Sequence, residues 1–170
     1  MAVTTTSYRA TPANRTAVIA TLALGIPAAV LFAGSFALPA YGGVVQLIAL
    51  LVLVAALFIA YKYIFSTYIY TIIDFGNDTP YLLVEQQQGK RSSLVFQAPL
   101  HAVVRVLLKG EPLPSGKVYM YTATLCGGSY HYVLCRIDGA NLLLKIEAND
   151  TFYAALTEAA AEARLAYKEE

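Results

Sequence analysis

The chain has 170 residues, of which 58% are hydrophobic and only 14% are charged. This length allows one ordinary domain with some additional chain, but the apolar fraction exceeds that of a typical soluble protein. The net charge of +1 and the scattered basic residues give no argument for nucleic acid as a partner.

Residues 1–15 precede a long uncharged segment and are interpreted as a cytoplasmic tail. No Asp, Glu, Lys or Arg occurs in residues 16–61. One bilayer crossing takes about 20 residues, so this segment is long enough for two crossings and a turn. We therefore predict a transmembrane helical hairpin over residues 16–65, with helices at about 16–38 and 44–65.

Small residues repeat along one face of each predicted helix. Gly25, Ala29 and Ala33 are spaced by four positions in the first helix, and Ala56 and Ala60 have the same spacing in the second. Small residues allow helix backbones in a membrane to approach closely. These faces are therefore candidate helix contacts, although an alanine-rich composition can also produce the spacing by chance.

A cleavable signal peptide is the alternative interpretation of the first apolar segment. Arg9 and Arg15 precede it, and Ser35, Phe36 and Ala37 resemble a small-x-small cleavage site. The apolar part of a signal peptide usually runs for about 7–15 residues, and this segment is longer. The length therefore favours a membrane-spanning helix.

Positive charge flanks the predicted hairpin at its two outer ends. Arg9 and Arg15 precede the first span, Lys62 follows the second, and the connecting turn carries no positive charge. The positive-inside rule then places both ends in the cytoplasm. We expect a multi-pass protein of the cell membrane whose soluble domain is cytoplasmic.

From residue 67 the pattern changes to short runs rich in Val, Ile, Leu and Tyr, separated by turn-forming clusters. This pattern is typical of antiparallel β-structure. Gly127 and Gly128 are predicted to form a hairpin turn between the fifth and sixth strands. The seven predicted strands cover approximately residues 67–75, 81–87, 92–98, 102–109, 117–126, 129–137 and 141–148.

Two of these strands alternate apolar and charged residues, as expected for a sheet with one buried face. Their predicted inner residues are Val104, Val106, Leu108, Leu142, Leu144 and Ile146. After the last strand, Asn149 or Asp150 can cap a helix that runs to about Tyr167. One face of this helix is apolar, so the helix must cover an apolar surface.

Seven consecutive antiparallel strands followed by an amphipathic helix resemble the pleckstrin-homology-like fold, a bent open barrel closed by its C-terminal helix. A helical hairpin that leads directly into the first strand is similar to the arrangement in bacterial membrane proteins that carry such domains. The resemblance covers residues 67–168 and depends on the order of the elements. It implies an α+β fold with a membrane anchor, in which two transmembrane helices precede a seven-stranded antiparallel open barrel and a C-terminal helix.

Basic residues concentrate in the loops after the second, fourth and sixth predicted strands. Because consecutive antiparallel strands alternate in direction, these loops are predicted to share the membrane end of the barrel, where anionic lipids attract positive charge. The predicted lipid-contact residues are Lys62, Lys90, Arg91, Lys109 and Lys117, and Arg136 belongs to the same loops. The ordinary alternative is that these are solvated turn residues.

The loop between the first two predicted strands carries Asp74 and Asp78 and no basic residue. Pleckstrin-homology domains that bind phosphoinositides generally use Lys and Arg around this loop. Phosphate recognition requires hydrogen-bond donors and positive charge, so phosphoinositide binding at this position is not expected.

Catalytic and metal-binding patterns are weak. Cys135 would lie opposite Met120 in the predicted hairpin, about 20 Å from Cys126, which is too far for a disulfide. His101, His131 and Cys126 can be drawn together as metal ligands, but no paired spacing supports such a site. We therefore expect no enzymatic activity, cofactor or metal, and keep catalysis through His101 or His131 as an alternative.

Four tyrosines are predicted to crowd one hairpin, where they either form a partner-binding patch or stabilise the sheet. They are Tyr119, Tyr121, Tyr130 and Tyr132. The function predicted from the sequence is a noncatalytic, membrane-anchored interaction module that binds a protein partner or the anionic lipid bilayer. The alternative is an accessory subunit of a larger integral-membrane complex.

Overall fold

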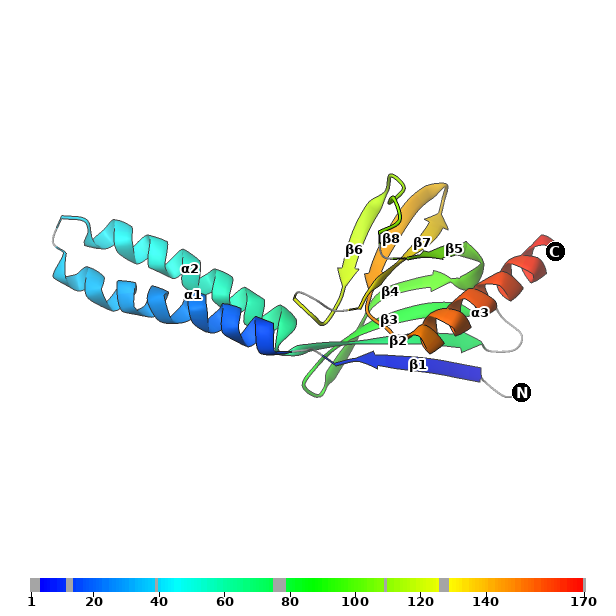
Figure 1. Ribbon diagram of the computed structural model, residues 1–170, viewed down its shortest axis with the longest axis horizontal. Helices are drawn as coiled ribbons and strands as arrows, with labels where there is room; N and C mark the ends of the chain where they lie inside the picture. The colour runs from blue at the N-terminus through cyan, green and yellow to red at the C-terminus, as the bar shows by residue number, and fades with distance from the viewer. Residues whose placement is uncertain are drawn as a thin grey trace. The chain divides into compact units, whose positions relative to one another are not determined.

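The computed structural model of the protein describes residues 4–11, 14–38, 40–74, 79–108, 110–125 and 129–169 (Figure 1). The chain divides into a β-rich unit and a helical unit. The β-rich unit comprises Met1–Thr11, Thr67–Ala123 and Gly127–Glu170, and the helical unit comprises Pro12–Ser66 with Thr124–Cys126.

The helical unit contains two long helices, α1 (Asn14–Gly34) and α2 (Gly42–Tyr63), with a short 3-10 helix η1 (Ser35–Ala37) between them. Both long helices have the length and composition needed to cross a membrane, which agrees with the two apolar helices predicted from the sequence. Only 11% and 17% of their most apolar windows are buried. Neither helix is therefore the core helix of a soluble domain, because most of such a helix would be buried.

Small residues line the contact between α1 and α2. Ala28 of α1 and Ala56 and Ala60 of α2 are buried, and a Cβ atom added to Gly25 would lie 3.9 Å from the Cβ of Ala56. The predicted contact is correct at Gly25, Ala56 and Ala60. Ala29 and Ala33 are exposed instead of buried, because contacts along a helix with 3.6 residues per turn alternate between steps of three and four.

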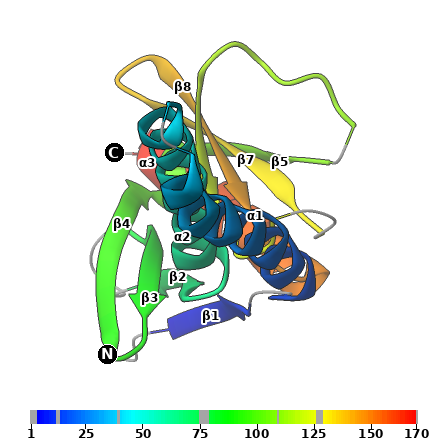
Figure 2. The ribbon, with the colours of Figure 1, turned by 90° about the vertical axis from the view of Figure 1, so that its left-hand side faces the viewer.

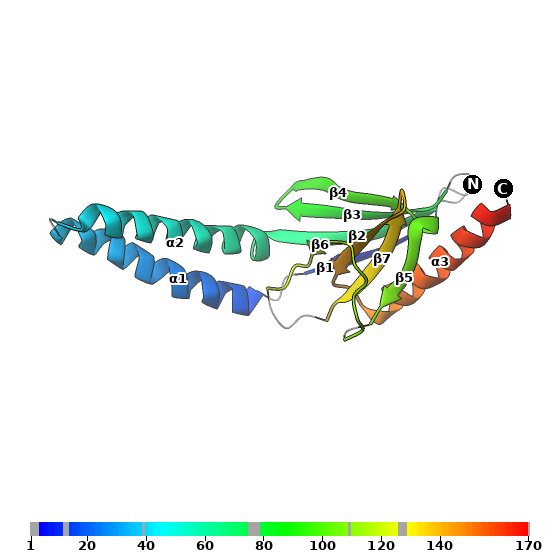
Figure 3. The ribbon, with the colours of Figure 1, turned by 90° about the horizontal axis from the view of Figure 1, so that it is seen from above.

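The first sheet has four strands in the order β1-β2-β3-β4. They are β1 (Thr4–Ala10), β2 (Ser66–Asp74), β3 (Tyr81–Gln88) and β4 (Arg91–Pro99). Strands β3 and β4 run antiparallel in a hairpin whose turn includes Gly89, at the positive φ of 60° that favours glycine (Figure 3).

Strand β1 is absent from the elements predicted from the sequence, although the tail predicted over residues 1–15 includes it. It pairs with β2 in antiparallel register from Thr4 opposite Asp74 to Ala10 opposite Tyr68. Three residues join β1 to α1, and two join α2 to β2. The helical hairpin is therefore an insertion between two neighbouring strands of one sheet.

The second sheet has the order β5-β7-β8-β6. Its strands are β5 (Val103–Leu107), β6 (Lys117–Tyr121), β7 (His131–Ile137) and β8 (Ala140–Ile146), and a 3-10 helix η2 (Leu100–Ala102) precedes β5. Strand β6 runs parallel to β8, whereas the other pairs are antiparallel. Residues 110–116 form a loop outside the second sheet that leads into β6 (light green in Figure 2).

Gly127 and Gly128 lie outside the described residues, but the hairpin predicted around them is wrong, because the described strands β6 and β7 are not neighbours and β6 pairs with β8. Cys135 therefore lies opposite Val103 and Leu142 and not opposite Met120. Eight strands in two four-stranded sheets replace the seven predicted strands.

A β-bulge explains another difference from the sequence pattern. The register of β5 against β7 shifts between Val103 and Arg105. An added residue reverses the faces of all residues that follow it. Val104, predicted to lie on the inner face, consequently packs against the small cluster that contains Leu107, whereas Val106 packs against the main core as predicted and Leu108 is exposed. The inner residues predicted for β8 are correct, since Leu144 and Ile146 are buried in the core.

Helix α3 (Asp150–Glu169) covers the core formed by the two sheets. The side chain of Asn149 accepts a hydrogen bond from the N–H of Phe152 at 3.0 Å, so Asn149 is the predicted cap. Phe152, Leu156 and Ala160 bury the apolar face of the helix. The buried hydroxyl of Tyr70 donates to the carbonyl of Tyr121 and joins the two sheets.

Candidate functional site

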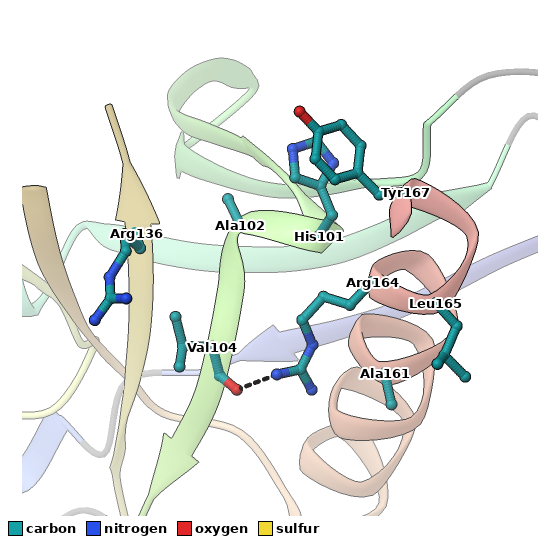
Figure 4. Close-up of a pocket in the computed structure, with 8 residues that line it drawn as sticks. All are labelled: His101, Ala102, Val104, Arg136, Ala161, Arg164, Leu165 and Tyr167. Atoms are coloured by element: carbon teal, nitrogen blue, oxygen red, sulfur yellow. Dashed lines mark hydrogen bonds between the residues drawn. The ribbon is translucent and has the colours of Figure 1, made fainter. Parts of the chain in front are cut away.

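A surface cavity of about 750 Å³ lies between the beginning of β5 and the C-terminal half of α3 (Figure 4). This volume is within the range of small-molecule and cofactor pockets. The lining combines apolar walls with two arginines and two aromatic rings. The residues are His101, Ala102, Val104, Arg136, Ala161, Arg164, Leu165 and Tyr167.

Arg164 connects α3 to β5 within this cavity. Its Nη1 donates to the carbonyl oxygen of Val104 at 2.9 Å, and its Nε donates to the carbonyl oxygen of Ala160 at 3.1 Å (Figure 4). A guanidinium group has five N–H donors, so further donors remain for a ligand. The two bonds hold the guanidinium in place and cap a main-chain carbonyl of β5.

The rings of His101 and Tyr167 stack at the other side of the cavity. Their centroids are 4.2 Å apart and their planes differ by 9°. Tyr167 is otherwise exposed, and the Nδ1 of His101 is buried with no hydrogen-bond partner. This pair anchors the C-terminal end of α3 against η2, because His101 belongs to η2.

A second cavity of about 680 Å³ lies further along β5 and α3, and Ala161 borders both cavities. It is lined by His131, Tyr153, Asp150 and Glu158, among others. The two cavities therefore lie next to each other along β5 and α3, and together they are called the groove between β5 and α3. His101 and His131 lie in different parts of this groove and do not form a common site.

Tyr153 has a structural role in the second cavity. Its hydroxyl accepts hydrogen bonds from the N–H groups of Ala148 and His131 and donates one to the carbonyl of Ile146. Burial raises the pKa of Tyr153 to about 12. The hydroxyl is therefore protonated at neutral pH and cannot serve as a general base.

The described residues offer no assembled metal site. Within ranges such as 79–108 and 129–169 no three His, Cys, Asp or Glu side chains come close enough to hold an ion, and Cys126 lies outside the described residues. Burial raises the pKa of Cys135 to about 12, so this thiol is not a nucleophile at neutral pH.

The predicted lipid-contact residues occupy separate places in the chain. Lys62 belongs to the last turn of α2 in the helical unit, where its Nζ lies 5.3 Å from the ring centroid of Tyr63. Lys90 and Arg91 are exposed at the β3–β4 turn, and Lys117 is exposed at the first position of β6. Lys109 lies outside the described residues.

The prediction that the basic loops share one end is wrong for the second sheet. Strands β5 and β7 are antiparallel neighbours, and Leu107 at the end of β5 lies opposite Tyr132 near the start of β7. The loops that follow these two strands therefore leave from opposite ends of the sheet. Arg136 precedes the β7–β8 turn, so it lies at the end opposite to the loop after β5.

Of the two interpretations of the four tyrosines, a single partner-binding patch is excluded. Tyr119 and Tyr121 stack on each other and pack against the main core beside Phe96. Tyr132 packs against a small cluster on the opposite face of the second sheet, and Tyr130 meets it edge to face with centroids 5.7 Å apart. The two tyrosine pairs therefore face different surroundings.

No protein-family model matches this chain, and no curated protein matches its sequence. Its function must be inferred from the geometry of the two units.

Proposed function

We propose that this chain is a noncatalytic interaction module, anchored in a membrane by α1 and α2, whose β-rich unit binds a protein partner or the anionic lipid surface. The observation that carries the proposal is the pairing of β1 with β2 on either side of the helical hairpin. Both ends of the hairpin therefore lead into neighbouring strands of the same sheet.

The surface of the helical hairpin supports membrane anchoring. Its inward face carries small residues, whereas large apolar side chains such as Ile19, Val30, Leu51 and Phe58 point outward and are exposed. In water this continuous apolar surface would be unfavourable, because monomeric soluble proteins rarely expose patches of that size. In lipid the same side chains are solvated, and the small residues permit close helix packing.

Strand β1 argues against a cleavable signal peptide. Cleavage near Ala37 would remove residues 4–10 and with them a strand of the first sheet. Ala10 is only 3% exposed and belongs to the main core. Removing it would expose core residues such as Tyr70 and leave β2 as an unprotected edge.

The same pairing constrains membrane topology. Because β1 precedes α1 and β2 follows α2, both ends of the hairpin emerge on one side of the membrane. Arg15 and Lys62 flank the two spans on that side. The positive-inside rule makes this the cytoplasmic side.

The resemblance to pleckstrin-homology-like domains involves a different set of strands from the one predicted from the sequence. Strands β1–β4 form one sheet, β5, β7 and β8 are antiparallel neighbours in the other, and α3 follows them, so seven strands precede a C-terminal helix when β6 is set aside. Strand β6 is then an addition at the edge of the second sheet, inserted between β5 and β7 in the chain. On this view the N-terminal strand completes the seven-stranded pattern.

The groove between β5 and α3 is the place we propose for a protein partner. It is open, it combines apolar walls with basic donors, and the described part of it contains no assembled metal site. Apolar walls with a few placed polar groups are typical of binding pockets.

The test uses the full-length chain with one epitope tag at each terminus, expressed in cells and fractionated. We expect the chain to resist alkaline carbonate extraction and both tags to be reached by protease from the same side of the membrane. Release by carbonate, or tags on opposite sides, would overturn the proposal. Purification in mild detergent then tests the partner, and a stoichiometric integral-membrane protein would instead favour the accessory-subunit alternative.

A further inference from the structure

The outer face of the second sheet, turned away from the main core, carries two rows of side chains that follow from strand register. Residues opposite each other across strands share a face. The first row contains Arg105, Leu134, Leu143 and Val118, and the second contains Leu107, Tyr132, Lys145 and Met120. The rows therefore run across all four strands, from β5 to the free edge at β6.

The two ends of this face differ in exposure. Leu107, Leu134 and Leu143 are buried in a small cluster of their own. At the β6 edge, Val118 and Met120 are 41% and 54% exposed, and Leu113, just before β6, is also exposed. Apolar side chains gathered at a sheet edge are a typical feature of interaction surfaces.

The charged residues on this face are basic. Arg105, Lys145 and, beyond the two rows, Arg136 lie on it, whereas Lys117, at the start of the edge strand, lies on the opposite face of β6, where its Nζ is 4.9 Å from the ring centroid of Tyr119. Glu111 pairs with Arg105 at 3.6 Å, at the β5 side. Neither row contains an acidic residue, although Asp138 lies in the β7–β8 turn and Glu147, which accepts a hydrogen bond from the N–H of Ala123, directly follows β8.

Tyrosines complete the composition. The Nζ of Lys145 lies 3.8 Å from the ring centroid of Tyr130, and Lys145 is directly opposite Tyr132. Exposed aliphatic groups, tyrosines and basic residues together are the combination found where proteins meet the lipid headgroup region. Aliphatic side chains contact the acyl chains there, tyrosines favour the interface between lipid and water, and basic residues pair with anionic phosphates.

We propose that the β6 edge of this face inserts into the headgroup region of an anionic bilayer, with Leu113, Val118 and Met120 entering it and Lys117 and Lys145 beside the phosphates. This proposal rests on the proposed function only because it requires a membrane. The anchor would hold the β-rich unit near the bilayer at a high effective concentration. The proposal places the principal lipid contact at the β6 edge and not at the β3–β4 turn, where the predicted contacts Lys90 and Arg91 lie. A protein partner would need acidic groups that match the basic face. An anionic bilayer supplies both acyl chains for the apolar side chains and phosphates for the basic residues.

The experiment reads lipid contact at single positions in the full-length chain. Met120→Cys is labelled with a fluorophore in a chain carrying Cys126→Ser, and the protein is reconstituted into vesicles containing phosphatidylglycerol. The buried Cys135 stays unlabelled because its thiol is inaccessible and its pKa is raised. Leu94→Cys is the matched control, since Leu94 is 52% exposed on β4 in the other sheet.

We expect lipids carrying a nitroxide near the headgroup to quench the label at position 120 severalfold more strongly than at position 94. Lys117→Gln with Lys145→Gln should reduce this quenching severalfold, as should replacement of phosphatidylglycerol by phosphatidylcholine. Lys90→Gln with Arg91→Gln is the charge-matched control and should have little effect.

Three outcomes would overturn the proposal: equal quenching at the two positions, a label protected from aqueous acrylamide but not quenched by lipid, or quenching that depends on Lys90 and Arg91. The second would show that a protein or a second copy of the chain covers the edge. The third would restore the β3–β4 turn as the lipid contact. Extraction by alkaline carbonate would instead contradict the membrane anchor, so the two failures are distinguishable.

Discussion

Ala10 and Tyr68 lie opposite each other across β1 and β2, although the whole helical hairpin separates them in the sequence. Both side chains are buried in the same core, where Tyr8 stacks parallel to Tyr70 with centroids 6.4 Å apart. The N-terminal strand is therefore part of the β-rich unit and cannot be treated as a dispensable tail. Because β2 follows both helices in the sequence, β1 can pair with it only after the hairpin has been synthesised.

Ala10→Asp should destabilise the β-rich unit by about 3 kcal/mol, because it buries a carboxylate without a partner. Ser7→Asp is the control, since Ser7 is exposed on the same strand. Ser7→Asp should change the free energy of unfolding by no more than about 0.5 kcal/mol. Thermal unfolding of the full-length chain in detergent measures the difference. Equal melting temperatures for the two variants would show that β1 does not contribute to the fold.

Tyr153→Phe should lower the free energy of unfolding by about 2–3 kcal/mol, because it leaves two N–H groups and one carbonyl without their partner. Tyr167→Phe is the matched control, since Tyr167 lies on the same helix, is 61% exposed and contributes its ring to His101. Denaturant unfolding monitored by near-ultraviolet circular dichroism compares them. A loss for Tyr153→Phe no larger than that for Tyr167→Phe would contradict the bonding role of the Tyr153 hydroxyl.

Alkaline pH should unfold the β-rich unit through its buried tyrosines. Burial raises the pKa of Tyr153 from 10.0 to about 12 and also raises the pKa of Tyr70. A raised pKa means that the folded state retains a proton that the unfolded state releases, so the associated stability is complete below about pH 10 and is lost as the pH rises towards 12. Unfolding free energies measured across this range should fall steeply for the wild type and less steeply for Tyr153→Phe. Parallel curves would contradict this linkage.

Local patterns were sufficient for most elements. The apolar segments predicted both helices of the hairpin, and turn residues such as Gly89 and Gly139 separated strands close to their observed bounds. Asn149 was recognisable as a helix cap because its side chain acts within three residues. In each case the residues that decide the structure are neighbours in the sequence.

Non-local pairing could not be read in the same way. Strand β1 is rich in Thr and Ser, and its partner lies beyond two helices, so no short pattern marks it as a strand. The parallel pairing of β6 with β8 depends on Gly116, where a Cβ atom would lie 2.5 Å from the carbonyl oxygen of Asn141. This contact joins distant segments and carries no periodic signal. The groove between β5 and α3 was missed for the same reason.

Arg164→Leu should weaken the contact between α3 and β5 and lower the free energy of unfolding by about 1–3 kcal/mol. The reason is the loss of hydrogen bonds from a charged donor to Val104 and Ala160. Arg136→Leu is the control, because the Nε of Arg136 reaches the Oδ1 of Asn141 only at 3.4 Å, near the limit of a hydrogen bond. Hydrogen exchange should accelerate in α3 and β5 for Arg164→Leu alone. Unchanged exchange in these elements would show that Arg164 does not hold the groove together.

Two adjacent glycines at the start of α2 should respond differently to the same substitution. A Cβ atom on Gly42 would lie 2.6 Å from the carbonyl oxygen of Ser35, whereas a Cβ atom on Gly43 would have no neighbour within 4 Å. The N–H of Gly42 also donates to the carbonyl of Leu38 at 2.8 Å and holds this position close to η1.

Gly42→Ala should therefore destabilise the helical hairpin by about 1–3 kcal/mol, because main-chain atoms must move to admit the methyl group. Gly43→Ala should be neutral or slightly stabilising, since alanine has the higher helix propensity. Unfolding of the helices in mixed detergent micelles containing sodium dodecyl sulfate, followed by far-ultraviolet circular dichroism, measures both variants. If Gly42→Ala proves as stable as Gly43→Ala, the close approach between η1 and α2 cannot be what shapes the turn.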